Sequence, residues 1–177
     1  MPLILGVDPG LTRCGYGLVR SEGNQAVEFG LFQSDSKADP RDRVGSIAAE
    51  LDAVITKHKP DLIALERVFA QANLRSVMGV AQVSGALMSI AFRHSIPLQF
   101  FTPSEVKAAV TGNGRATKDQ VTMMVTRILK LEVAPKPADV ADALAVALCA
   151  TKRGVAVGTS AQQKWVAAAK AATRRLG

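Results

Sequence analysis

Two short apolar runs, LILGVD at residues 3–8 and LIALE at residues 62–66, each end in a carboxylate. Runs this short and this apolar are typical of strands that are buried on both faces of a sheet. Side chains alternate along a strand, so Asp8 shares a face with Gly6, and Glu66 shares a face with Ala64. Because ligand sites gather at the carboxyl ends of such strands, both acids are candidates for a functional site.

The rest of the chain predicts an α/β fold in which helices flank a mixed sheet. CGYGLVR at 14–20 and QAVEFGLFQS at 25–34 indicate two more strands, joined to the first in an antiparallel meander. PLQFF at 97–101 indicates a further strand. Apolar spacing and Pro or Gly boundaries predict helices at about 41–59, 72–94, 104–111, 117–131 and 137–150. We expect one domain over residues 1–152 and a basic tail, disordered or helical, over residues 153–177.

Two further acids stand in PADVADALA, at residues 137–145. Asp139 and Asp142 are three residues apart, so they lie on one face of the predicted helix. The residues after Asp142 are apolar on every side, which predicts that the helix is buried. Four carboxylates that converge in a semi-buried site repel one another unless a cation neutralises them, which favours a hard divalent metal. Two ions about 3.5–4 Å apart would suit phosphodiester hydrolysis, with Asp8 bridging both.

Each acid also has an ordinary structural explanation. Asp8-Pro9-Gly10 has the composition of a simple turn. Asp139 at the N-cap and Asp142 at the third helical position would both be favourable near the positive end of a helix. Glu66 has Arg67 beside it as a candidate ion-pair partner. The sequence alone leaves these alternatives open.

Basic residues are concentrated outside the segments that hold the four acids. The net charge is +7; residues 67–130 carry eight basic and two acidic side chains, and residues 151–177 carry six basic side chains and no acid. Such a block predicts a polyanionic partner, nucleic acid above all, or a basic solvated surface. We expect no signal peptide and no stretch apolar enough to span a membrane. The lone cysteines, Cys14 and Cys149, suit a reducing cytosol, and a zinc site is not expected.

Four segments together resemble the RuvC family of bacterial Holliday-junction resolvases. They are GVDPGLTRCGYG, ALERVFAQANLRSVMGVAQVSG, TPSEVKAAVTGNGRATKDQV and PADVADALAVAL, and the similarity covers nearly all of residues 3–150. The resemblance implies an RNase H-like fold with a mixed five-stranded sheet. It also implies a homodimeric, cytoplasmic endodeoxyribonuclease of DNA recombination and repair, which makes paired symmetric nicks in opposing strands of a four-way junction. Mg²⁺ is the implied cofactor, two ions per site, with Mn²⁺ as a substitute. The RuvA–RuvB branch-migration complex is the implied partner.

The same resemblance assigns roles to individual residues. The catalytic, metal-binding carboxylates match Asp8, Glu66, Asp139 and Asp142, and the basic residues near the scissile phosphate match Lys107 and Lys118. The aromatic residue that wedges into the junction matches Phe69, although a core phenylalanine is the alternative. We add Arg75 and Arg115, both in the basic block, as DNA-binding candidates.

A symmetric junction needs two active sites, which a twofold dimer supplies. The predicted helix at about 72–94 is our candidate interface, since its small residues allow close approach: Ala81, Ser84, Gly85 and Ala86. Three rival functions stay open. The segment from Asp8 to Thr12 also resembles the phosphate turn of actin-like ATPases and sugar kinases. The second rival function is that of a junction-binding protein without catalysis. The third is that of a nuclease of the same fold that acts on RNA–DNA hybrids.

Overall fold

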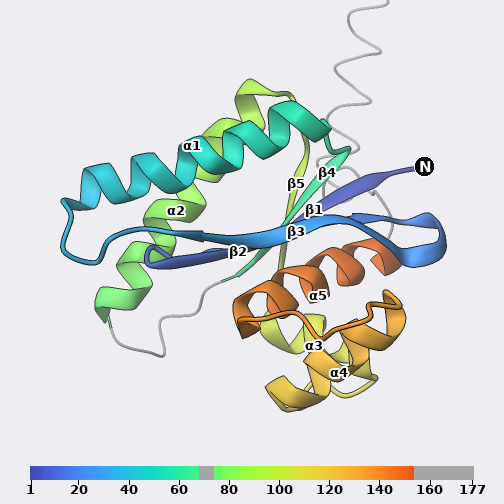
Figure 1. The fold of residues 1–177 in the computed structure, drawn as a ribbon. Helices are drawn as coiled ribbons and strands as arrows, with labels where there is room; N and C mark the ends of the chain where they lie inside the picture. The colour runs from blue at the N-terminus through green and yellow to red at the C-terminus, as the bar shows by residue number, and fades with distance from the viewer. Residues whose placement is uncertain (68–73, 154–177) are drawn as a thin grey trace, which may run out of the picture.

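The computed structural model describes residues 1–67 and 74–153, which form a sheet between two layers of helices (Figure 1). The strands are β1 (Leu3–Asp8), β2 (Arg13–Arg20), β3 (Gln25–Gln33), β4 (Leu62–Glu66) and β5 (Leu98–Phe101). The helices are α1 (Pro40–His58), α2 (Leu74–Arg93), α3 (Pro103–Thr111), α4 (Lys118–Ile128) and α5 (Ala138–Arg153). A 3₁₀ turn, η1 (Glu22–Asn24), joins β2 to β3. Every predicted strand and helix is present, with differences of a few residues at the ends.

The sheet has the order β3-β2-β1-β4-β5, so β1 lies at its centre. β1, β2 and β3 form the predicted antiparallel meander, whereas β4 and β5 run parallel to β1. Val7 of β1 pairs with Leu65 of β4, so Asp8 and Glu66 end neighbouring parallel strands at the same edge. The mixed five-stranded sheet of an RNase H-like fold is therefore confirmed.

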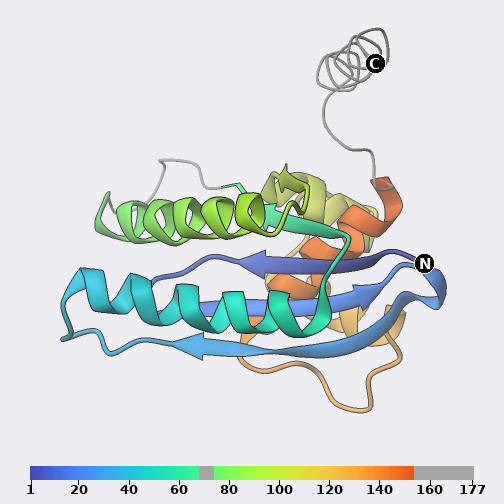
Figure 2. The ribbon, with the colours of Figure 1, turned by 90° about the horizontal axis from the view of Figure 1, so that it is seen from above.

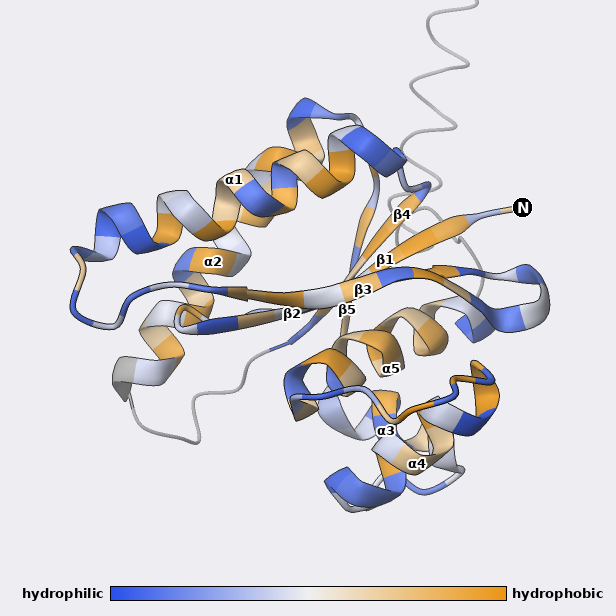
Figure 3. Cartoon of the chain, viewed as in Figure 1, coloured by the Kyte–Doolittle hydropathy of each residue, from blue (hydrophilic) through white to orange (hydrophobic). Residues whose placement is uncertain are grey.

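Two hydrophobic cores fill the space on either side of the sheet. α1 and α2 lie side by side on one face, as the view from above shows (Figure 2). α3, α4 and α5 cover the other face, where α5 packs directly on β1 and β2. The apolar sides of the helices are turned toward the strands (Figure 3). Asp8 and Glu66 share their face with Ile4, Leu62 and Ala64, which belong to the core beneath α5.

Two glycines set how closely α5 approaches the sheet. An added Cβ on Gly6 would overlap the carbonyl oxygen of Ala143, and one on Gly15 would overlap the carbonyl oxygen of Asp139. The absent side chains therefore let the backbone of α5 rest on β1 and β2. This close contact carries the first turns of α5, with Asp139 and Asp142, to the edge where β1 ends.

α4 is shorter than the predicted 117–131 segment. It begins with a capping box in which the Thr117 side chain accepts from the Gln120 backbone and the Gln120 side chain accepts from the Thr117 backbone. It ends at Ile128, because Lys130 adopts a left-handed conformation with φ of 53°. The capping box fixes Lys118 as the first helical residue.

The expectation that no stretch suits a membrane span is wrong for α2. By length and composition alone, Ser76–Arg93 qualifies, and it is the one such stretch within residues 1–67 and 74–153. Our expectation looked for an unbroken apolar run, whereas α2 mixes its large apolar residues with Gly, Ser and Ala. Its inner face packs Val83, Leu87 and Ile90 into the core, while only 28% of the stretch is buried. α2 therefore has a core face and a second, outward apolar face.

Candidate active site

A pocket of about 230 Å³ opens where β1 and β4 end. Three of the predicted carboxylates, Asp8, Glu66 and Asp142, lie in its wall beside the two predicted lysines, Lys107 and Lys118. The remaining wall is apolar: Pro103, Val106 and Val121. β1, β4, α3, α4 and α5 thus each contribute to one polar pocket with an apolar floor.

Asp8 is the most perturbed carboxyl group of the pocket. Its pKa is raised from 3.8 to about 8, first by burial and then by the charges of Glu66, Asp142 and Asp139. Lys118 acts in the opposite direction, but it does not offset the burial. All three other acids thus act electrostatically on Asp8, although Asp139 does not line the pocket.

Glu66 lies in a similar environment. Its pKa is raised from 4.5 to about 7, chiefly by burial and also by the charge of Asp142, while Lys118 and Lys107 act in the opposite direction. Among the described residues neither Glu66 nor Asp8 forms a salt bridge. The neighbouring Arg67 is turned elsewhere, since its guanidinium lies 5.6 Å from the centre of the Phe100 ring. The expected ion pair of Glu66 with Arg67 is therefore not formed, and the basic residues near Glu66 are Lys107 and Lys118.

Asp139 and Asp142 differ from the first two acids because each contacts a cation. The Lys118 ammonium donates a hydrogen bond to Asp142 over 3.1 Å, which raises the pKa of Lys118. Arg13 Nε lies 3.4 Å from Asp139 Oδ2. α5 begins at Ala138, so Asp139 lies inside the first turn and not at the N-cap. Asp139 is thus not the N-cap, but as an acid of the first turn it does lie near the positive end of the helix.

The donor set fits a hard divalent cation. All four acids offer oxygen ligands, and the two buried ones lack a neutralising partner among the described residues. No three acidic, histidine or cysteine side chains of the described residues stand close enough together to form a ready metal shell. Two of the carboxylates are instead turned toward Arg13 and Lys118. Metal binding at this site would therefore exchange those cations for the metal ion.

Comparison with known proteins identifies the family. Residues 4–150 match the family model described as crossover junction endodeoxyribonuclease RuvC. The chain belongs to the RuvC family. A RuvC of Frankia alni is 51% identical over 87% of this chain and 80% of its own length, and one of Paenarthrobacter aurescens is 48% identical over 97% of both chains. The activity of the chain is therefore endonucleolytic cleavage of crossover junctions in DNA.

Solved RuvC structures share the fold. Thermus thermophilus RuvC in complex with a Holliday junction substrate has a TM-score of 0.80 at 32% identity, covering 84% of this chain and 92% of that one. The free Thermus thermophilus RuvC gives a TM-score of 0.77 at 33% identity, covering 83% of this chain and 92% of that one. The yeast mitochondrial Holliday junction resolvase Ydc2, at 14% identity and a TM-score of 0.60, covers 84% of this chain and 77% of that one and shares the fold alone.

The other residues predicted to bind DNA are not gathered at the RuvC pocket. Arg115 is exposed in the loop before α4, where its backbone N–H donates to the Asn113 side chain, and it does not line the pocket. Phe69 lies outside the described residues. Arg75 stands in the first turn of α2, but its side chain lies outside the described part of the chain. The roles of all three residues stay predictions.

Sequence reasoning missed Arg13, a polar neighbour of the RuvC acids. Asp8 pairs with Gly15 across the β1–β2 ladder, so Arg13 stands two residues beyond the end of β1. Residues two apart on a strand share a face, and Gly15 faces the backbone of Asp139. The hairpin register, had it been assigned from the sequence, would have placed Arg13 beside α5.

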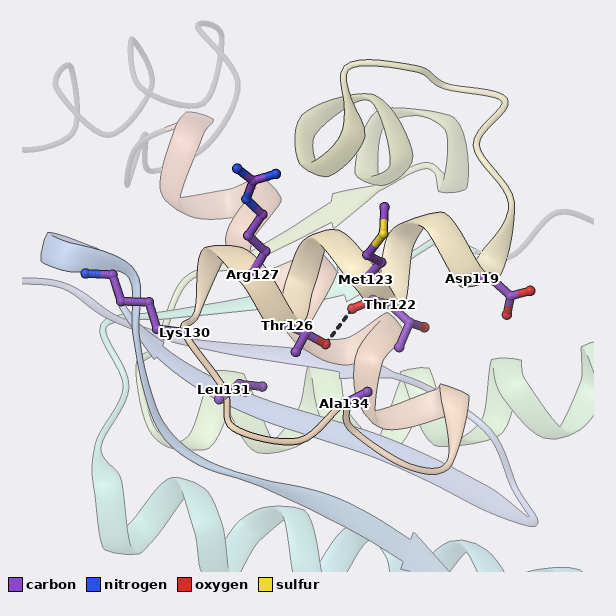
Figure 4. A pocket seen from close by; sticks show the side chains of 8 residues that line it. All are labelled: Asp119, Thr122, Met123, Thr126, Arg127, Lys130, Leu131 and Ala134. Carbon is purple, nitrogen blue, oxygen red and sulfur yellow. Dashed lines mark hydrogen bonds between the residues drawn. The ribbon is translucent and has the colours of Figure 1, made fainter.

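A larger pocket of about 620 Å³ lies along the outer side of α4 (Figure 4). Its polar lining includes a single carboxylate, Asp119, and two cations, Arg127 and Lys130. One acid beside two cations is not a ligand set for a divalent metal. The α4 pocket is therefore not an alternative catalytic centre of this RuvC-family chain.

Proposed function

We propose that the chain resolves four-way DNA junctions by metal-assisted hydrolysis at Asp8, Glu66, Asp139 and Asp142. The observation that carries this proposal is the gathering of Asp8, Glu66 and Asp142 in one pocket with Lys107 and Lys118, where the pKa of the half-buried Asp8 is raised. Such a group is unfavourable in a metal-free fold and is expected where a cation binds. The structure of a RuvC in complex with a Holliday junction substrate supports four-way DNA as the substrate.

Each residue has a distinct part in the proposed reaction. The four carboxylates would hold Mg²⁺, or Mn²⁺ in its place, and Asp8 is the candidate bridge because it acts electrostatically with all three others. Bound divalent ions supply activation of the attacking water and stabilisation of the leaving 3′ oxygen. Lys107 and Lys118 stand at the rim and would hold the scissile phosphate. Pro103, Val106 and Val121 supply the apolar part of the pocket wall.

Substrate comparison tests this function. The full chain is mixed in Mg²⁺ with a synthetic four-way junction, a linear duplex and an RNA–DNA hybrid that share one sequence, and the products are mapped on a denaturing gel. We expect symmetric paired nicks in the junction, little cutting of the other two substrates, and no cutting in EDTA. Preferential cutting of the hybrid would favour the rival nuclease function, and binding of the junction without cutting would favour the non-catalytic one.

We further propose that the chain is a homodimer whose copies meet through the outward face of α2. This face carries exposed large apolar side chains, Met78, Met88 and Phe92, of which Phe92 is 85% exposed. Gly85 lies between them, and a Cβ built on it meets nothing within 4 Å. A long apolar stripe that is open at its centre suits a second copy of the same helix. A DNA junction as substrate also agrees with a cytoplasmic location and with the RuvA–RuvB complex as a partner. Both of these stay predictions.

Phe92→Asp is expected to dissociate the dimer. A charge at the centre of an apolar interface should weaken association about 30-fold or more, as loss of a hot-spot residue does. The fold should be unaffected, because Phe92 packs on little in a single copy. Sedimentation velocity at micromolar concentration gives the measurement.

The matched control for this variant is Val133→Asp. Val133 is 74% exposed in the connection between α4 and α5, away from α2, so its replacement should leave the dimer intact. A wild-type chain that sediments as a monomer, or a Phe92→Asp chain that stays dimeric, would contradict the proposed interface.

A further inference from the structure

The four carboxylates of the proposed site divide into two pairs. Asp8 and Glu66 end buried strands, have strongly raised pKa values and form no salt bridge within the described part of the chain. Asp139 and Asp142 are on α5, and each contacts one cation. Lys118 is a predicted phosphate contact, but the cation on Asp139, Arg13, has no role in the site as proposed so far.

The backbone directs Arg13 toward Asp139. β2 begins at Arg13, antiparallel to β1, and Asp8 pairs with Gly15. Arg13 and Gly15 therefore share one face of the sheet, and this is the face on which the first turn of α5 rests. The Arg13 guanidinium is thus attached to the strand next to Asp8 and lies beside Asp139 at the start of α5.

The ion pair between Arg13 and Asp139 is weak enough for a metal ion to replace Arg13. The Arg13 side chain is 54% exposed, against 21% for Asp139, and the Nε–Oδ2 distance of 3.4 Å is that of a loose ion pair. Exposed pairs of this kind contribute roughly 0–1 kcal/mol, so a divalent ion can displace the guanidinium at little cost. The displaced guanidinium stays on the strand next to Asp8, where its planar fork suits a DNA phosphate.

We propose that Arg13 is a positioning residue that holds Asp139 in the metal-free protein and moves to a phosphate of the junction when a divalent metal takes that carboxylate. The proposal rests on the function proposed above. It makes metal and DNA binding mutually reinforcing, because the phosphate removes a competitor of the metal and the metal releases a cation for the phosphate. Such coupling is reciprocal, so it is measurable from either ligand.

The metal arm of the test is a Mn²⁺ titration of the full-length chain without DNA, followed by the EPR signal of free Mn²⁺. Arg13→Gln should bind Mn²⁺ roughly two- to fivefold more tightly than the wild type, since the competing cation is gone. Arg13→Lys, which keeps the charge, should bind close to wild type. Arg41→Gln is the matched control, because Arg41 is an exposed arginine paired with Asp42 at the start of α1.

The DNA arm measures affinity for a four-way junction against salt concentration in Ca²⁺. Loss of one phosphate contact in Arg13→Gln should make the slope of log K against log salt shallower by about 0.9, and Arg41→Gln should not change the slope. Unchanged or weaker Mn²⁺ binding by Arg13→Gln, or an unchanged slope, would overturn the role of Arg13. If wild-type Mn²⁺ binding is absent, or is unaffected by Asp139→Asn, the proposed metal site itself fails.

Discussion

Asp8→Asn is expected to abolish junction cleavage and to stabilise the metal-free protein at the same time. Removing the charge of the central carboxylate should lower the cleavage rate in Mg²⁺ by at least about 10³-fold, as loss of a principal electrostatic contact does. The same change removes a buried acid whose pKa is raised to about 8. At pH 7 this should raise the free energy of unfolding by about 2–4 kcal/mol. Single-turnover cleavage and urea denaturation in EDTA measure the two effects.

Asp119→Asn is the matched control for this carboxylate-to-amide change. Asp119 follows Lys118 on α4 but is exposed and does not line the 230 Å³ pocket. We expect near wild-type cleavage from this variant and no gain in stability. An Asp8→Asn chain that cleaves the junction at the normal rate would remove Asp8 from the mechanism. One that is inactive and also less stable would show that Asp8 serves the fold rather than a metal.

Without metal, the protein is expected to lose stability as the pH rises from about 4 to about 8. The folded-state pKa values of Asp8 and Glu66 are raised to about 8 and about 7, above their ordinary values of 3.8 and 4.5. Well below pH 3.8 both groups are neutral in the folded and unfolded states, so they cost nothing there. Between pH 4 and 8 the unfolded chain gains stability by ionising these groups first, and the penalty is complete above pH 8.

Mg²⁺ should remove this pH-dependent penalty. The unfolding free energies with Mg²⁺ and with EDTA should nearly coincide at pH 4 and differ by at least about 3 kcal/mol at pH 8. Glu28 provides an internal contrast, because hydrogen bonds from Lys57 and His58 lower its pKa to about 2. Its contribution to the free energy of unfolding is therefore lost only as the pH falls below 4.5, in the opposite direction to that of Asp8 and Glu66. Urea denaturation at several pH values gives both curves, and parallel curves would contradict a metal site at the two acids.

The sequence predicted the elements of this fold well because their signals are local. LILGVD and LIALE are too short and too apolar for anything but buried strands, and Asp8 and Glu66 follow from where those runs stop. PADVADALA placed Asp139 and Asp142 on a buried helix for the same reason. Gly6 and Gly15 determine how closely that helix approaches, but the sequence alone does not say which backbone each glycine meets.

What the sequence did not predict depends on contacts between distant segments. The ion pair of Arg13 with Asp139 joins residues that are far apart in the chain, and it exists because β2 lies beneath α5. The end of α4 follows from the left-handed backbone of Lys130, which the continuing apolar pattern through Leu131 conceals. The sequence also could not show which apolar residues of α2 face outward, since apolar residues occupy both its core face and its exposed face.

The central claim is that the four carboxylates act as one site. Single-turnover cleavage of a four-way junction by Asp8→Asn, Asp142→Asn and the double variant tests it most directly. Groups that act as a unit are not additive, so we predict that the double variant cleaves about as slowly as the slower single variant. Losses that multiply, so that the double variant is slower by the product of the two single effects, would contradict the claim and assign the two acids to independent roles.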